Sequence, residues 1–176
     1  MAGKDCVAVA CDLRFGSGPT LITVGPRPML ALDHTLVLAT GLEGDVTDLQ
    51  LELEALLFQK HLRPHSVATL TSHLLYRRKQ APYFVEPIVV GVDPQTKQPF
   101  LCSFDSIGAQ SLSHSYCGND IAHWQPHLEA EQLVQVCGQA LQAALERDCT
   151  SGYGIVVYLL RHDGSVTEYQ LETRND

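Results

Sequence analysis

Cysteine and histidine are the side chains in this sequence that could bind a metal ion, and the chain has six cysteines and eight histidines. None of the cysteines forms a C-x-x-C pair, the spacing typical of a structural zinc site. His61 and His65 are four residues apart, as are His123 and His127, which would place each pair on one face of a helix. Proline falls inside both pairs, however, and disfavours a continuous helix there. We therefore expect loop histidines and no metal site.

Composition restricts the class of protein. Hydrophobic residues make up 45% and charged residues 18% of the 176 residues, which is typical of a globular chain and excludes a disordered one. A length of about 150 residues per domain predicts a single domain over residues 1–176. The net charge of −8 repels phosphate, so we expect neither nucleic acid nor an anionic membrane as a partner.

The cysteines and the first residues bear on the cellular compartment. No apolar run reaches the roughly 18 residues that a membrane span needs. Residues 1–5 lack the apolar stretch of a signal peptide. We therefore expect the cysteines to be reduced thiols, in a protein of the cytoplasm and nucleus.

Apolar periodicity predicts the elements that must position any site. Continuous apolar runs rich in valine and leucine predict buried strands, and apolar residues spaced three and four apart predict amphipathic helices. We expect strands at 6–11, 21–24, 36–40, 84–92, 100–104, 155–160 and 166–171, and helical stripes over 46–57, 67–75 and 133–145. This order of strands, two helices, strands, one helix and strands predicts an α+β fold of layered antiparallel sheets covered by helices.

Several local features refine this prediction. Residues 12–19 read as a turn, and Asp45 offers an N-cap oxygen to the first helix. Pro87 inside 84–92 indicates an edge strand or a bulge. Asp163-Gly164 is a two-residue hairpin signal, whereas residues 107–127 form a connection that is long for a compact domain.

Five segments, in chain order, resemble the beta subunits of the eukaryotic 20S proteasome core particle, and among them the beta type-3 group. These segments are VAVACDLRFG, GLEGDV, LLYRRKQAPYFVEPIVVGVDP, PFLCSFDSIGA and ERDCTSGYG. The resemblance extends from about Gly3 to Leu171, and the chain looks shorter than family members near residue 60 and in 107–127. It implies the four-layer αββα sandwich of the N-terminal-nucleophile hydrolases.

Active members of that family use an N-terminal threonine whose hydroxyl attacks the peptide carbonyl. The family's A-x-D pattern matches Asp12, and counting back from it places the nucleophile before Met1, so we expect no counterpart in this chain. The family lysine falls near Arg27, but arginine stays protonated and cannot shuttle a proton. The D-x-x-S-G pattern matches Asp148 and Ser151, although an aspartate followed by serine and glycine also simply forms a turn. The resemblance therefore implies four remnant positions without catalysis, cofactor or metal.

The beta type-3 resemblance implies a non-catalytic subunit that supports ATP- and ubiquitin-dependent protein degradation. Its expected partners are other beta subunits in a seven-membered ring, alpha-ring subunits and assembly chaperones. The pattern S-x-D-x-I-G matches Asp105, with Ala109 four residues on, where beta type-3 relatives often have cysteine. We hypothesise that Asp105 lines the trypsin-like pocket of the neighbouring subunit, the alternative being a solvated aspartate at a strand end. Two other functions stay open: an active threonine-type peptidase subunit of a proteasome-like particle, and an unrelated α/β scaffold.

Overall fold

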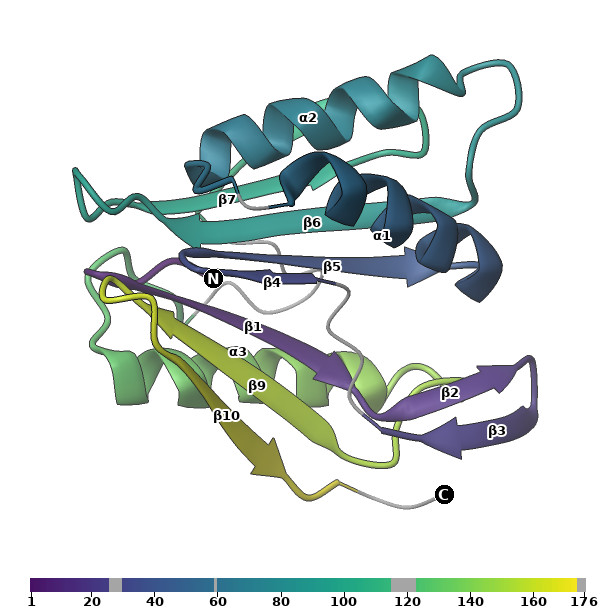
Figure 1. The fold of residues 1–176 in the computed structure, drawn as a ribbon. Helices are drawn as coiled ribbons and strands as arrows, with labels where there is room; N and C mark the ends of the chain where they lie inside the picture. The colour runs from purple at the N-terminus through teal and green to yellow at the C-terminus, as the bar shows by residue number, and fades with distance from the viewer. Residues whose placement is uncertain (26–29, 59, 115–122, 174–176) are drawn as a thin grey trace.

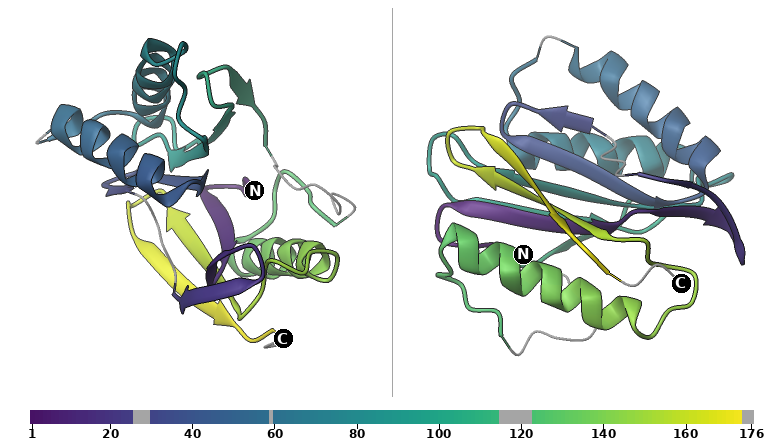
Figure 2. Two further views of the ribbon diagram at one scale, coloured as in Figure 1. Left: turned by 90° about the vertical axis from the view of Figure 1, so that its right-hand side faces the viewer. Right: turned by 90° about the horizontal axis from the view of Figure 1, so that it is seen from below.

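The computed structural model describes residues 1–25, 30–58, 60–114 and 123–173. Helices α1 and α2 cover one face of a five-stranded sheet, a three-stranded sheet packs on its other face, and α3 covers the outside of the three-stranded sheet (Figures 1 and 2). In chain order the elements are β1 (Cys6–Asp12), β2 (Arg14–Ser17), β3 (Thr20–Val24), β4 (Leu30–Leu32), β5 (Thr35–Gly41), α1 (Glu43–Leu57), α2 (Pro64–Arg77), β6 (Val85–Val92), β7 (Pro99–Phe104), β8 (Gln110–Leu112), α3 (Ala130–Leu145), β9 (Ile155–Arg161) and β10 (Val166–Leu171).

All strand pairs within the described residues are antiparallel. The five-stranded sheet has the order β4-β5-β6-β7-β8, and the three-stranded sheet has the order β1-β9-β10. Strands β2 and β3 form a separate two-stranded ribbon, which projects from one end of the molecule in Figure 1.

Three apolar clusters fill the spaces between the four layers. Leu53 of α1 and Val89 of β6 belong to the cluster under α1 and α2, whereas Val90 and Leu160 belong to the cluster between the sheets. Leu159 belongs to the third cluster, under α3. Neighbours on β6 and β9 enter different clusters because successive side chains of a strand point to opposite faces. This explains the continuous apolar runs, and the predicted four-layer αββα fold of the α+β class is confirmed.

The helices and strands expected from apolar periodicity are all present, with bounds that differ by a few residues. The structure also contains strands that periodicity did not indicate. The predicted turn over 12–19 is wrong in its middle, because residues 14–17 form β2 and the chain reverses at Gly18-Pro19. Within 107–127 the residues 110–112 form β8, while residues 115–122 lie outside the described part of the chain.

Two predictions about single residues are also wrong. Asp45 is not the N-cap of α1, which has Leu42 in that place without a side-chain hydrogen bond. Instead, Asp45 Oδ2 accepts a hydrogen bond of 2.8 Å from the Phe84 N–H and ties the start of α1 to the segment before β6. Pro87 marks neither an edge nor a bulge, because β6 is the central strand of its sheet and pairs with β5 in unbroken register through Ala39 and Pro87. Pairing with β7 begins at Ile88, so Pro87, which has no N–H, lies just outside the paired stretch on that side.

The hairpin between β9 and β10 is longer than the predicted two-residue turn. The Gly164 N–H donates to the Arg161 carbonyl and the Arg161 N–H donates to the Ser165 carbonyl, both at 3.0 Å. Residues 162–164 therefore form the loop, and Gly164 ends it with a φ of +83°. Three-residue hairpin loops that end on a left-handed residue are the next most common type after two-residue loops.

Candidate functional site

Strands β1 and β9 bring the family-pattern residues to one end of the molecule. Asp12 ends β1 and pairs with Ile155, the first residue of β9, so the loop between α3 and β9 runs beside Asp12. In that loop the Gly152 N–H donates to Asp12 Oδ2 at 3.1 Å. Asp148 and Ser151 lie in the same loop, so three of the four predicted remnant positions come together. The fourth, Arg27, lies outside the described residues.

Asp148 organises this loop through hydroxyl and amide donors. Ser151 Oγ donates to Asp148 Oδ2 at 2.6 Å, and both the hydroxyl and the N–H of Thr150 donate to Asp148 Oδ1. These bonds, that from Ser151 most strongly, lower the pKa of Asp148 to about 2. A carboxylate with so low a pKa is a poor proton acceptor near neutral pH. The Ser151 hydroxyl is therefore bound to a turn-forming carboxylate and lacks an effective base there.

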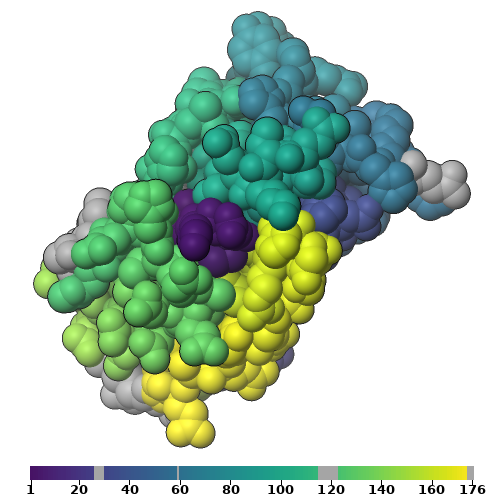
Figure 3. All heavy atoms as spheres, turned by 90° about the vertical axis from the view of Figure 1, so that its left-hand side faces the viewer, coloured from purple at the N-terminus to yellow at the C-terminus, as the bar shows by residue number. Residues whose placement is uncertain are grey.

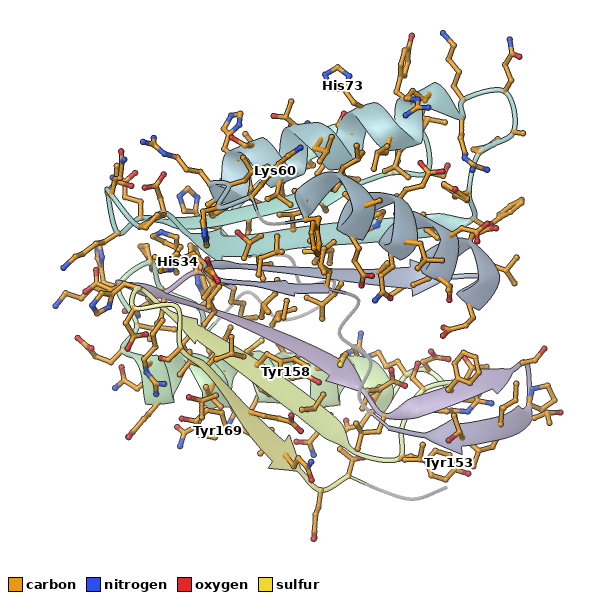
Figure 4. The ribbon with its side chains drawn as sticks, in the orientation of Figure 1. His34, Lys60, His73, Tyr153, Tyr158 and Tyr169 are labelled. Atoms are coloured by element: carbon orange, nitrogen blue, oxygen red, sulfur yellow. The ribbon has the colours of Figure 1, made fainter. Side chains whose placement is uncertain are left out.

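Asp12 lies in a different electrostatic environment. Its burial raises the pKa of the Asp12 carboxyl, and the hydrogen bond from the Gly152 N–H opposes that rise. The loop keeps an uncommon backbone shape next to it, since Gly152, Tyr153 and Gly154 have φ values of +148°, +62° and +110°. Tyr153, labelled in Figure 4 at the end of the molecule that carries the β2–β3 ribbon, is one of two non-glycine residues with positive φ in the described chain.

The N-terminal residues are held away from this loop. The Met1 amine donates to the Ala8 carbonyl at 2.7 Å, and Trp124 Nε1 donates to the Ala2 carbonyl at 2.9 Å. In Figure 3 the dark purple N-terminal residues lie in a seam between teal, green and yellow surfaces. Ala8 precedes Asp12 by four residues of β1, which separates the amine from Asp12 by about 13 Å along the strand. The N-terminal amine therefore does not lie beside the Asp12 carboxylate.

The structure also places the histidines and cysteines considered as metal ligands. His61 precedes α2 and His65 lies in its first turn, so the two do not share a helix, and His65 is not the loop histidine that we expected. His61 Nδ1 lies 2.5 Å from Asp33 Oδ2 on the exposed surface. Across the described ranges, no three His, Cys, Asp or Glu side chains are grouped so that they could hold a metal ion. Five cysteines of the described part form no disulfide, and Cys117 lies outside it.

Asp105 lies in the exposed turn between β7 and β8. Its Oδ1 accepts hydrogen bonds from the N–H groups of Ile107 at 3.0 Å and Ala109 at 2.7 Å. The turn is fixed to α2, since Ser72 Oγ donates to the Gly108 carbonyl at 2.6 Å. The carboxylate therefore stabilises its own turn while the side chain remains exposed to solvent, as does Ala109.

Comparison with known proteins identifies the family of this chain. Residues 1–160 match the family described as Proteasome subunit. The chain belongs to the proteasome subunit family. Proteasome subunit beta type-3 of Drosophila melanogaster is 35% identical over 203 residues, covering 100% of this chain and 94% of the relative. The protein of the same name from Saccharomyces cerevisiae is 35% identical over 192 residues, covering 100% and 93%, and beta type-3-B of Arabidopsis thaliana is 34% identical, covering 91% and 86%.

Sequence reasoning missed one residue that shapes the site of this proteasome-family chain. Arg14 donates through Nη1 to the Thr150 carbonyl at 2.5 Å and through Nη2 to the Gly18 carbonyl at 2.6 Å. It thereby joins the β2–β3 ribbon to the loop after α3. Nothing in its sequence context distinguishes Arg14 from a solvated arginine, whereas the S-G-Y-G run does contain the glycines that a loop with positive φ needs.

No helix in the described part is both long and apolar enough to span a bilayer.

Proposed function

We propose that this chain is a non-catalytic beta-type subunit of the 20S proteasome core particle, of the beta type-3 kind. The names of its relatives support the beta type, and the family supports a role within a proteolytic complex. One observation supports the absence of catalysis: the Met1 amine donates to the Ala8 carbonyl at 2.7 Å, four residues along β1 from Asp12, so it is not placed to serve as a base beside the Asp12 carboxylate. The subunit works in the cytoplasm and nucleus by completing the ring.

Exposed apolar surface supports a role in assembly. Every residue of β3 is exposed, and the side chains of Leu21, Ile22 and Val24 are 39%, 60% and 46% exposed. A ribbon of two strands is marginally stable in water without packing against another element. Neighbouring beta subunits of a seven-membered ring, subunits of the alpha ring and assembly chaperones are the partners that would cover such surface.

Asp105 gives the subunit a second proposed role, in the substrate pocket of its neighbour. Two backbone N–H groups hold one carboxylate oxygen, so the charge has a defined position on an exposed turn. A fixed carboxylate attracts the lysine or arginine side chain of a substrate. Ala109, on the same turn, adds a small apolar contact to that pocket.

Native mass spectrometry of particles that carry a tagged copy of the chain tests the proposed function. We expect the chain in an intact 20S particle, and we expect no covalent adduct on it after treatment with a threonine-directed epoxyketone that labels the active subunits of the same sample. An adduct on this chain would support the alternative, an active threonine-type peptidase subunit. A chain absent from every particle would refute membership of the ring.

The variant Asp105→Asn tests the pocket role without disturbing the turn, because the asparagine Oδ1 still accepts the two N–H groups. We expect slower cleavage after Arg and Lys by assembled particles, with unchanged cleavage after large apolar residues as the internal control. Equal cleavage of basic substrates by both particles would contradict the role of Asp105.

A further inference from the structure

A pocket opens between the connection from α1 to α2 and the turn from β4 to β5. Its volume is about 390 Å³, which falls in the range of sites that hold small molecules. Figure 4 labels two of its residues, Lys60 above the five-stranded sheet and His34 at one end of it. None of the family-pattern residues lines this pocket, so the resemblance to the proteasome subunits does not account for it.

Apolar side chains form one wall of the pocket. Leu57 belongs to the buried cluster under α1 and α2, and Leu32 packs against that cluster. Leu62 also lines the pocket and is 37% exposed. Such a wall can take the apolar part of a ligand out of water, which is favourable in proportion to the area covered.

The rim of the pocket is cationic, in a chain whose net charge is −8. Lys60 lines the pocket, is exposed, and forms no ion pair with a carboxylate among the described residues. Arg63 also lines it and donates through Nη2 to Gln95 Oε1, which holds the guanidinium in place and leaves its other N–H groups for a ligand. Because Arg63 immediately precedes α2, the positive end of that helix adds to the charge of the rim.

The carboxylates near the pocket are already hydrogen bonded. Asp33 is the acidic residue of the described lining, and its Oδ2 lies 2.5 Å from His61 Nδ1. Asp93 lies in the loop after β6, where hydrogen bonds from backbone N–H groups of its own loop, and to a lesser degree the Arg63 charge, lower its pKa. The two cations of the rim therefore exceed the single carboxylate of the lining, and the pocket favours an anion.

We infer that this pocket binds a small phosphate monoester with an apolar body. The phosphate lies between the Lys60 ammonium and the Arg63 guanidinium, and the apolar body packs on the leucine wall. A phosphate monoester carries a charge of about −1.5 to −2 near pH 7 and three acceptor oxygens, which suits two cations better than a carboxylate does. The inference goes beyond the proposed function, because no other subunit contributes to the site.

Calorimetric titration of the full-length chain with phenyl phosphate tests the site, with inorganic phosphate, phenol and benzoate as comparison ligands. We expect phenyl phosphate to bind at least about tenfold more tightly than each of the three, because it alone combines a doubly charged head with an apolar ring. Benzoate that binds as tightly would refute the preference for phosphate. Inorganic phosphate that binds as tightly would refute the role of the leucine wall, and phenol that does so would refute the role of the cations.

Charge-removing variants locate the site. Lys60→Gln with Arg63→Gln should weaken phenyl phosphate binding at least about tenfold, since each change removes a charge-assisted hydrogen bond. The matched control Arg77→Gln with Lys79→Gln removes the same charge at the other end of α2, about 20 Å away at 1.5 Å per residue, and should leave binding unchanged. Equal weakening by both pairs, or none by the first, would show that the pocket does not hold the phosphate.

Photolabelling of the wild-type chain gives a measurement that needs no substitution and so does not depend on the folding of a variant. Azidophenyl phosphate, which carries the same head and ring, should label peptides that contain residues 30–34 or 60–63, and an excess of phenyl phosphate should suppress that label. A label confined to other peptides, or one that excess phenyl phosphate does not suppress, would overturn the inference.

Discussion

Gly108 gives the sharpest test of how the turn that carries Asp105 is held. Its φ is +86°, and a methyl group added at this position would lie 2.5 Å from the Ser72 carbonyl oxygen and 3.2 Å from Leu75 Cβ. The left-handed conformation costs an alanine about 1 kcal/mol. The oxygen belongs to the backbone in the middle of α2 and cannot move aside, and overpacking of this kind adds about 2 kcal/mol. We therefore expect Gly108→Ala to lower the free energy of unfolding by about 3 kcal/mol.

Gly18→Ala is the matched control, because Gly18 has a φ of +54° and no atom within 4 Å of the added methyl group. It should lose about 1 kcal/mol, from the backbone conformation alone. Urea unfolding of the two full-length variants measures the difference. In a thermal scan the losses correspond to about 6–12 °C for Gly108→Ala and about 2–4 °C for the control. If the two variants lose the same free energy within about 0.5 kcal/mol, the packing of this turn against α2 is not what requires glycine.

Three further predictions concern other groups. Tyr83→Phe removes the hydroxyl that donates to Glu52 at 3.1 Å. Urea unfolding should show that the free energy of unfolding falls by about 1 kcal/mol. An unchanged free energy of unfolding would show that this hydrogen bond does not stabilise the fold. Because burial raises the pKa of Asp12 in the folded chain, ionising it costs stability as the pH rises above its unfolded pKa. Asp12→Asn should therefore gain stability relative to wild type between pH 3 and pH 7, and a gain that shrinks with rising pH would have the wrong sign. Burial raises the pKa of Cys102 to about 11, so iodoacetamide at pH 8 should modify exposed Cys149 and spare Cys102 in peptide mass spectra.

The helices and strands could be predicted from the sequence because buried apolar residues recur with the period of the helix or strand that contains them. The runs 88–92 and 155–160 are apolar on both faces of their strands, because each face packs against another layer. The stripes that end at Leu57 and Leu145 likewise show which face of each helix meets a sheet. These patterns predict layered antiparallel sheets covered by helices, whereas the four-layer αββα order is implied by the resemblance to the proteasome beta subunits.

The errors arise where backbone contacts, not burial, decide the conformation. β2 is a strand because it pairs with β3 across Gly18-Pro19, and its residues are too exposed to leave an apolar pattern. Asp45 is a residue type that commonly forms an N-cap, but its hydrogen-bond partner is the N–H of Phe84, which is distant in sequence. A long-range partner of this kind cannot be read from neighbouring residues.

In the candidate site, too, the sequence pattern does not show which contacts its residues make. Asp148 matches a family pattern, yet its bonds to Thr150 and Ser151 form a turn that any chain with this connection between α3 and β9 could use. A match at Asp148 or Ser151 therefore carries little information about catalysis. What distinguishes an active site is a nucleophile paired with a base whose pKa lies near the working pH. The hydrogen bonds that make Asp148 a good turn former lower its pKa, so the better it performs the structural role, the worse a base it becomes.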